Sequence, residues 1–474
     1  MLTIASGIKP GLSLILFLGL LIRFIFLYLL KDAQLVGDMQ DYYRIAVELK
    51  NGQGFNSTIR APLYPYIVSF LFILFDSSNL ILVKIFQSVI SLVNVILVYL
   101  LGQEIFDRRT GILAAALFCF YPTLLFYNNF ILTEVLFITL FTSFLLSFTA
   151  YLNLSKIPPH LIPLPLPEGE DRGRGVRIIL LALSGFLLGL TTLCRSVTLQ
   201  LPLIIVPFIF LVDRFERISR KTLLTFVFLA SFILVLTPWT IRNYKVHHVF
   251  IPVDLIGKIN VMLGNYEYTP LNRAWDAHIT QTGERAWTYP LRKEGRYDKM
   301  TEAERADWSF HEGVRFMIQH PALTLKRSFV KFCNFWELER GPSSMAVKGF
   351  LGNANIAILE IFAALGCIFQ SLILLGTIFF FVYFFKDNIV TNVLFSLIVV
   401  YFTLMHSMIY GHPRYQLPLT PILFVCCANT FLRIREIGRQ KRWIQFLVAA
   451  SVCAFFTFVW IRQFYIHVNN LYLV

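Results

Sequence analysis

The chain has 474 residues, of which 57% are hydrophobic and only 15% are charged. Soluble domains carry about 25% charged residues, so this composition excludes an ordinary soluble protein and predicts a polytopic membrane protein surrounded by membrane lipids. The net charge of +14 does not indicate a nucleic-acid partner, because lysine and arginine accumulate in the cytoplasmic loops of membrane proteins and at lipid headgroups.

Eleven apolar segments are predicted to cross the membrane as helices. A further apolar segment, Pro62–Phe75, is only 14 residues long and is opened by two prolines. Because a spanning helix needs about 20 apolar residues, we expect this segment to lie along the outer membrane interface. The eleven predicted spans are Leu12–Leu30, Leu80–Leu101, Gly111–Phe126, Ile131–Leu152, Ile178–Leu193, Leu199–Val212, Leu223–Thr240, Ile356–Phe385, Ile389–Tyr410, Leu417–Leu432 and Trp443–Trp460.

The positive charges of the short loops predict the orientation. If Pro62–Phe75 does not cross, the basic loops at Arg108, at residues 156–177, at Arg214–Lys221 and at Arg433–Arg442 all fall on one side. The positive-inside rule makes that side cytoplasmic, with the N-terminus inside and the C-terminus outside. We therefore expect a multi-pass protein of the cell membrane, of the bacterial inner or plasma membrane type.

The polar regions divide the chain into three parts. Residues 1–240 are predicted to form an N-terminal transmembrane module, with a first outer loop at residues 31–79. Residues 241–355 are predicted to form an extracytoplasmic loop region, and residues 356–474 a C-terminal transmembrane module. The linker Pro158–Gly175 is rich in proline, glycine and charge, and is predicted to be an unstructured cytoplasmic insertion.

The first outer loop contains a polar stretch, Gly37–Phe55, within which a short surface helix is predicted. The helix is predicted to stop at Asn51-Gly52 and Gly54, residues that tolerate a positive φ. Tyr42, Ile45 and Leu49 give it an apolar stripe at helical spacing. Asp38 stands at its start, where the free N–H groups and the dipole of a helix favour a carboxylate. Asp38 is therefore either an N-cap or an acid held at the membrane surface, and this stretch alone leaves both interpretations open.

Further polar residues fall at the outer ends of the predicted spans or one turn inside. Each has an ordinary explanation: Glu134 as a helix-packing hydrogen bond, Arg195 as a snorkelling side chain, and Arg414 as a headgroup anchor. One acid and several arginines on one side are also what a site for a phosphorylated lipid needs. The set comprises Asp38, Arg60, Glu134, Arg195, Arg242, Asn243, His412 and Arg414.

A series of stretches between residue 37 and about residue 421 carries a resemblance to a known family, in that family's order. They read GDMQDYYRIAVELKNGQGF, RAPLYPY, the YP-NN-LTEVLF stretch around Glu134, GLTTLCRS, TPWTIRNY, GNYEYT, QHPALTLKRSFVKFCNFW and HPRYQLPLTP. With them the chain resembles the GT-C glycosyltransferases, specifically the family-39 and ArnT-like branch related to protein O-mannosyltransferases. The resemblance implies an all-α GT-C transmembrane bundle of about 11 spans, with interfacial helices in the first outer loop and a long outer loop region.

The resemblance also implies an activity. It predicts an inverting glycosyltransferase that moves a hexose or pentose from a polyprenyl-phosphate donor to a lipid, glycan or protein acceptor on the extracytoplasmic face. The family's acid in the first outer loop maps onto Asp38, which is predicted to be the general base. Met39 follows Asp38 at the position where several relatives carry a second acid. Asp41 or Glu134 would have to take the role of that second acid. No DxD motif occurs, in agreement with a lipid-linked donor; no cofactor is predicted, and a divalent metal is left open.

The remaining site predictions assign binding roles. The fork of an arginine side chain suits a leaving phosphate, so Arg60, Arg195, Arg242 and Arg414 are predicted to hold the donor phosphate. The residues predicted to orient the substrates are Asp41, Tyr42, Glu134, Asn243, His412 and Tyr415.

Two other classes of function fit the same residues. A transporter or flippase of lipid-linked or phosphorylated solutes would use the arginines without bond making, and a non-catalytic scaffold in envelope assembly would tolerate loss of Asp38. The long outer region and the lack of an obvious internal repeat favour the enzyme, because many transporters are built from inverted halves.

Overall fold

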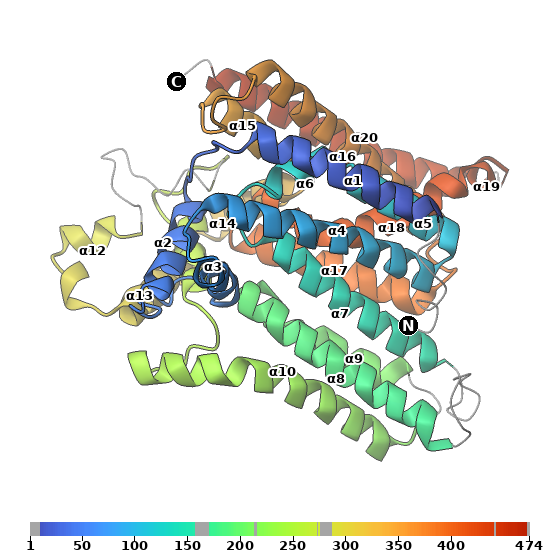
Figure 1. Ribbon diagram of the computed structural model, residues 1–474, viewed down its shortest axis with the longest axis horizontal. Helices are drawn as coiled ribbons and strands as arrows, with labels where there is room; N and C mark the ends of the chain where they lie inside the picture. The colour runs from blue at the N-terminus through green and yellow to red at the C-terminus, as the bar shows by residue number, and fades with distance from the viewer. Residues whose placement is uncertain are drawn as a thin grey trace.

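A computed structural model of the protein describes residues 10–156, 170–212, 216–272, 274, 287–439 and 442–471. Within these residues the chain forms α-helices and short 3-10 segments, and no strand. Long helices pack side by side into one bundle, and shorter helices lie at one end of it (Figure 1). The predicted all-α fold of a polytopic membrane protein is confirmed.

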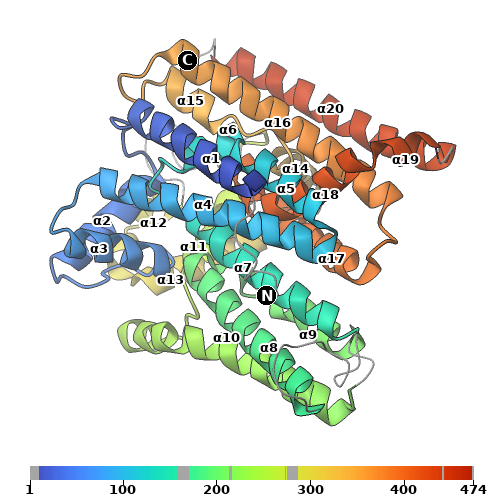
Figure 2. The same ribbon diagram turned by 45° about the vertical axis from the view of Figure 1, so that its right-hand side comes forward.

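Nine helices of the described residues are long and apolar enough to cross a membrane. They form the bundle that Figure 2 shows from a second side. Their bounds are α1 (Pro10–Leu29), α4 (Leu80–Ile105), α7 (Glu134–Leu154), α8 (Glu170–Cys194), α10 (Ile218–His247), α16 (Ile356–Tyr383), α17 (Ile389–Met408), α18 (Thr420–Leu432) with the preceding η5 (Pro413–Leu419), and α20 (Trp443–Leu471).

The other two predicted spans are shorter than expected. The segment at residues 111–126 is divided into α5 (Arg108–Cys119) and α6 (Pro122–Tyr127), because a proline disfavours the helical conformation of the residue before it. The segment at residues 199–212 begins with η2 (Ser196–Thr198) and continues as α9 (Pro202–Val212).

The divided segment still carries the chain across the bundle. Asn153 near the end of α7 donates a hydrogen bond of 2.9 Å to the Glu104 side chain near the end of α4. These two helices therefore end together, and α5 and α6 return the chain to the end where α7 begins.

Several of the shorter helices gather at one end of the bundle, where α2, α3, α12 and α13 lie together, while α19 lies at the opposite end (Figure 1). From this layer α14 leads back and packs against α17 and η5. The bounds of the shorter helices are α2 (Asp38–Lys50), α3 (Leu63–Leu74), α11 (Ile256–Gly264), α12 (Tyr289–Lys293), η4 (Tyr297–Lys299), α13 (Glu302–Gln319), α14 (Pro321–Phe335), α15 (Gly341–Val347) and α19 (Ile434–Arg439).

The first loop leaves and re-enters the bundle at the same end. Lys84, in the first turns of α4, donates hydrogen bonds to the backbone oxygens of Leu30 (2.6 Å) and Lys31 (3.0 Å), which directly follow α1. Helix α3 therefore does not cross the bundle, as the sequence predicts for Pro62–Phe75.

The basic loops meet at the opposite end. Arg109, Lys156 and Arg433 line one hollow there together with Asp387, which forms an ion pair with Arg433. This sorting of charge agrees with the predicted topology, while the assignment of this end to the cytoplasm stays a prediction. The linker prediction is wrong in its last part, because α8 begins at Glu170 and its residues 170–175 are helical. Residues 158–169 of that linker lie outside the described residues.

Close helix packing positions the ends of α8 and α10 beside the end layer. An added Cβ at Gly185 would lie 2.2 Å from the Phe228 oxygen, and one at Gly189 would lie 2.8 Å from the Val235 Cβ. Any larger residue at Gly185 would force α10 away from α8. The small residues of α8 therefore fix the helix whose end carries Cys194 and leads to Arg195.

Candidate active site

Asp38 lies at the first residue of α2 and is held by two arginines. Its Oδ1 is 2.6 Å from Arg60 Nη2, and its Oδ2 is 2.6 Å from Arg414 Nη2. The N-cap position is occupied by Gly37, with no side-chain capping bond, so the capping interpretation of Asp38 is wrong. Burial raises the pKa of Asp38, but the Arg60 and Arg414 guanidinium groups outweigh this effect and hold the pKa well below its usual range.

Arg60 joins two acids of the same helix. Besides Asp38, its Nη2 contacts Asp41 Oδ2 at 2.9 Å, and its Nε lies 3.3 Å from the same oxygen. The guanidinium also lies over the Tyr42 ring, 5.6 Å from the centroid. Asp41 is one turn after Asp38 on α2, so both carboxylates face the same arginine. Arg60 therefore fixes the start of α2 against the loop before α3.

Arg414 links Asp38 to a second, deeper acid. Its Nε is 3.2 Å from Glu134 Oε1, and Arg195 Nη1 is 3.3 Å from the same oxygen. The Glu134 side chain is only 1% exposed, and its Oε2 has no hydrogen-bond partner among the described residues. Cations beside a buried carboxylate stabilise its ionised form, so Glu134 holds two arginines next to Asp38.

Aromatic and histidine side chains support this cluster. Tyr415 lies beneath the guanidinium groups of Arg195 (5.2 Å) and Arg414 (5.4 Å), and it stacks on His406 at 4.6 Å. The Nδ1 of His412 accepts a hydrogen bond of 3.0 Å from the Arg414 backbone N–H. His412 therefore caps the turn that presents Arg414.

Two cavities meet at the cluster, of about 390 Å³ and about 470 Å³. The first is lined by Glu134, Arg195 and Asp254 together with apolar side chains, and the second by Glu337, Glu339 and Arg340. Both volumes are within the usual range of ligand sites. The residues that line both cavities include Asp38, Arg60, Arg414 and Tyr415.

Two of the predicted site residues lie elsewhere. Arg242 Nη1 donates to Thr58 Oγ1 at 2.8 Å, and its guanidinium lies 4.8 Å from the Trp239 ring centroid. Asn243 donates to the backbone oxygens of Ile251 (3.0 Å) and Val253 (3.1 Å). Neither residue lines either cavity. In this structure they tie loops to the end of α10, so the predicted contact of Arg242 and Asn243 with substrate has no geometric support.

Three acids that the sequence analysis did not single out also line the cavities, and two of them, Asp254 and Glu339, have a raised pKa. Asp254 accepts a hydrogen bond of 2.9 Å from the Ser196 hydroxyl, and burial raises its pKa to about 6. Glu339 lines the second cavity, and burial raises its pKa to about 7. Both lie in the long polar region, where acids are ordinary, so sequence offered no signal to distinguish them. Within the described residues no cluster of three or more histidine, cysteine or acidic side chains is arranged to hold a metal.

Comparisons with known proteins bear on the fold of the chain and on a family that part of it matches. Residues 59–157 match the model of the dolichyl-phosphate-mannose-protein mannosyltransferase family. No curated protein has a matching sequence. The oligosaccharyltransferase AglB from Archaeoglobus fulgidus, solved with an inhibitory peptide and a dolichol-phosphate, superposes with a TM-score of 0.51 at 14% identity over 94% of this chain and 54% of that one.

The apo form of the A. fulgidus enzyme gives a TM-score of 0.52 at 14% identity, again over 94% of this chain and 54% of that one. ArnT from Cupriavidus metallidurans bound to undecaprenyl phosphate is similar at a TM-score of 0.38 and 13% identity, over 89% of this chain and 78% of that one. The chain spans about half the length of the oligosaccharyltransferase. It has the GT-C fold.

Proposed function

We propose that this GT-C-fold membrane protein is a glycosyltransferase that takes its sugar from a polyprenyl phosphate and transfers it, with inversion, to an acceptor hydroxyl. The observation that carries the proposal is Asp38, held by Arg60 and Arg414 where two cavities meet. One acid between two cavities suits a reaction in which donor and acceptor approach a general base from different sides. The family match and the likeness to an enzyme solved with a dolichol-phosphate support a lipid-phosphate donor.

The first cavity is the proposed donor site. It combines Arg195 and Arg414 with apolar side chains such as Val197, Phe402 and Met405. Arginines bind phosphate through paired hydrogen bonds, while apolar walls suit the first units of a prenyl chain. We assign the donor phosphate to Arg195 and Arg414, with Arg60 close by on the other side of Asp38.

Phosphate binding changes the basicity of Asp38. In the free protein its pKa lies below the usual range, which makes the carboxylate a weak base. A phosphate that draws Arg414 away removes one positive charge from Asp38, so the pKa of this carboxylate rises. Binding of the donor phosphate thereby makes Asp38 a stronger base before the sugar is transferred.

The proposed transfer is a single displacement. Asp38 accepts the proton of the acceptor hydroxyl while the acceptor oxygen bonds to the anomeric carbon. The bond between that carbon and the phosphate oxygen breaks, and its electron pair leaves on the phosphate. Arg195 and Arg414 neutralise the charge that develops there.

We place this chemistry on the extracytoplasmic face of a cell membrane. The support is the charge pattern, because the end opposite Asp38 carries the basic loops at Arg109, Lys156 and Arg433.

The test uses the purified full-length protein in lipid nanodiscs with polyprenyl phosphate that carries one radiolabelled hexose or pentose at a time. The proposal predicts enzyme-dependent loss of label from the lipid when an acceptor is added. If no donor loses label, the same protein is reconstituted into closed vesicles. Movement of the intact labelled lipid from one leaflet to the other would then support a transporter or flippase instead.

A further inference from the structure

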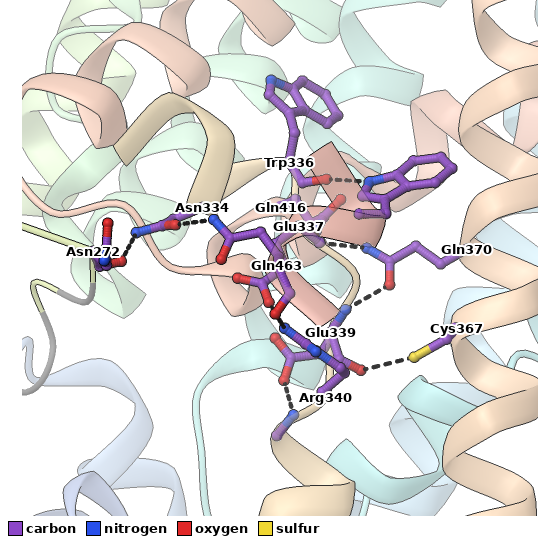
Figure 3. A network of polar contacts seen from close by, with 12 residues as sticks. Asn272, Asn334, Trp336, Glu337, Glu339, Arg340, Cys367, Gln370, Gln416 and Gln463 are labelled. Carbon is purple, nitrogen blue, oxygen red and sulfur yellow. Dashed lines mark hydrogen bonds and ion pairs between the residues drawn. The ribbon is translucent and has the colours of Figure 1, made fainter. Parts of the chain in front are cut away.

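An irregular segment between α14 and α15, residues 336–340, is fixed from several sides inside the protein (Figure 3). The Glu337 backbone oxygen accepts hydrogen bonds from the side-chain amides of Gln370 (3.2 Å) and Gln416 (2.7 Å). The Glu339 backbone N–H donates to Gln370 Oε1 at 2.8 Å. Helix α16 and η5 thus supply the backbone partners that regular secondary structure would otherwise supply.

The same segment is held at both ends. Trp460 of α20 donates its indole N–H to the Trp336 backbone oxygen at 2.9 Å, and Cys367 of α16 lies 3.8 Å from the Glu339 backbone oxygen. Side chains from distant helices therefore fix the position of Glu339 before any ligand arrives. Preorganisation of this kind is expected of a binding site.

The Glu339 side chain is buried, and burial raises its pKa, an effect that the Gly341 N–H, the Arg414 guanidinium and the Tyr127 hydroxyl partly offset. It is 1% exposed, and its Oε1 accepts a hydrogen bond of 2.7 Å from the Gly341 N–H. Its Oε2 has no hydrogen-bond partner among the described residues. A buried carboxylate oxygen without a partner is costly, and Glu339 lines the second cavity. A ligand hydroxyl in that cavity would satisfy it.

The charges around the second cavity select the class of ligand. Three acids (Asp38, Glu337 and Glu339), three arginines (Arg60, Arg340 and Arg414) and Lys348 line it. The arginines disfavour a cation, and the acids disfavour an anion. Groups that both donate and accept hydrogen bonds suit this mixture, and hydroxyls are such groups. Tyr127, Tyr410 and Tyr415 also line this cavity.

We infer that the second cavity binds a neutral carbohydrate acceptor, and that Glu339 accepts a hydrogen bond from one of its hydroxyls while another hydroxyl faces Asp38. This inference rests on the proposed function, because it assigns the acceptor to the cavity on the side of Asp38 away from the donor. It makes Glu339 a residue that binds and positions the acceptor, and leaves the proton transfer to Asp38.

The test measures the binding of three ligands to the full-length protein in lipid nanodiscs. Methyl β-maltoside is the neutral sugar probe, n-butylamine is the cation of comparison, and undecaprenyl phosphate probes the donor cavity. Glu339→Gln keeps an oxygen for the Gly341 N–H but replaces the free carboxylate oxygen by a donor. We expect maltoside binding to weaken at least about ten-fold in this variant, with the rise in Tm caused by undecaprenyl phosphate unchanged.

Glu436→Gln alters a carboxylate at the opposite end of the bundle and is the matched control. It should leave the binding of maltoside and of undecaprenyl phosphate unchanged. If Glu339→Gln does not fold, Glu339→Asp tests the same point, since it keeps the charge but withdraws the carboxylate by one methylene. Equal maltoside binding in parent and Glu339 variants, no maltoside binding by the parent, or preferential binding of n-butylamine would each overturn the inference. A parent that binds maltoside but not undecaprenyl phosphate would contradict the proposed function instead.

Discussion

Arg414 and Asp38, which are 376 positions apart in the chain, form an ion pair with Nη2 and Oδ2 2.6 Å apart. The contact joins the first loop of the chain to the turn that opens η5. Because Arg414 also lies 3.2 Å from Glu134, it connects the part-buried Asp38 to the fully buried Glu134. A ligand that engages Arg414 therefore acts on both acids at once.

Arg414 is predicted to contribute to donor binding through its geometry as well as its charge. Arg414→Lys keeps the charge but loses the paired hydrogen bonds, so donor use should weaken at near-normal protein abundance, and Arg414→Ala should be worse. The measurement is the KM for the polyprenyl-phosphate donor. Arg242→Lys is the control, because Arg242 lies outside both cavities; an equal effect of the two lysine variants would refute this assignment.

Glu134 is predicted to be a determinant of stability. Its carboxylate is 1% exposed and faces Arg195 and Arg414, so Glu134→Ala leaves two arginines without their buried partner. Breaking a buried pair in this way costs about 3–5 kcal/mol. Thermal unfolding in detergent should show a clearly lowered Tm. A Tm equal to that of the parent would mean that water already screens these charges.

Stability should fall as the pH rises through the titration of Glu339. Burial raises its pKa from 4.5 to about 7, so the folded protein binds more protons than the unfolded chain between these values. Stability is therefore greatest below the unfolded pKa and is lost as the pH approaches the folded one.

Glu339→Gln should reduce the difference in Tm between pH 5 and pH 8. Part of the difference should remain, because the pKa of Asp254 is raised as well, to about 6. An unchanged difference in the variant would exclude Glu339 as the titrating group.

The orientation of the bundle can be measured with single cysteines. Gln53→Cys lies in the loop after α2, and Arg435→Cys lies in α19 at the opposite end. A membrane-impermeant thiol reagent should label Gln53→Cys in intact cells and leave Arg435→Cys unlabelled, relative to the parent protein. The reverse pattern would place the candidate active site in the cytoplasm.

Much of the local structure was predictable from the sequence. The apolar stripe of Tyr42 and Ile45 and the turn residue Gly52 predicted α2, which runs from Asp38 to Lys50. Hydropathy and charge also predicted which residues share an end of the bundle, including Asp38, Arg195 and Arg414. These patterns are set by local spacing and by the membrane, so one chain suffices to see them.

The sequence did not predict which of the side chains at that end of the bundle contact one another. Arg242 and Arg414 occupy similar places at the ends of apolar segments, yet only Arg414 faces Asp38, because helix packing decides which side chains converge. The same reason explains why Glu339 was missed. Its burial results from contacts with Gln370 and other distant residues, and nothing in its local sequence indicates them.

The most direct test of the account is Asp38→Asn. The Asp38 side chain does not cap α2, so the substitution leaves the start of the helix unchanged. It removes the base, and with it the negative charge that lies between Arg60 and Arg414. The account predicts that sugar transfer falls by about 10²–10⁴-fold. It also predicts that undecaprenyl phosphate binds at least as tightly as to the parent, because Arg60 and Arg414 are released from the carboxylate. Transfer within a few-fold of the parent at equal protein level, or clearly weaker binding of undecaprenyl phosphate, would contradict it.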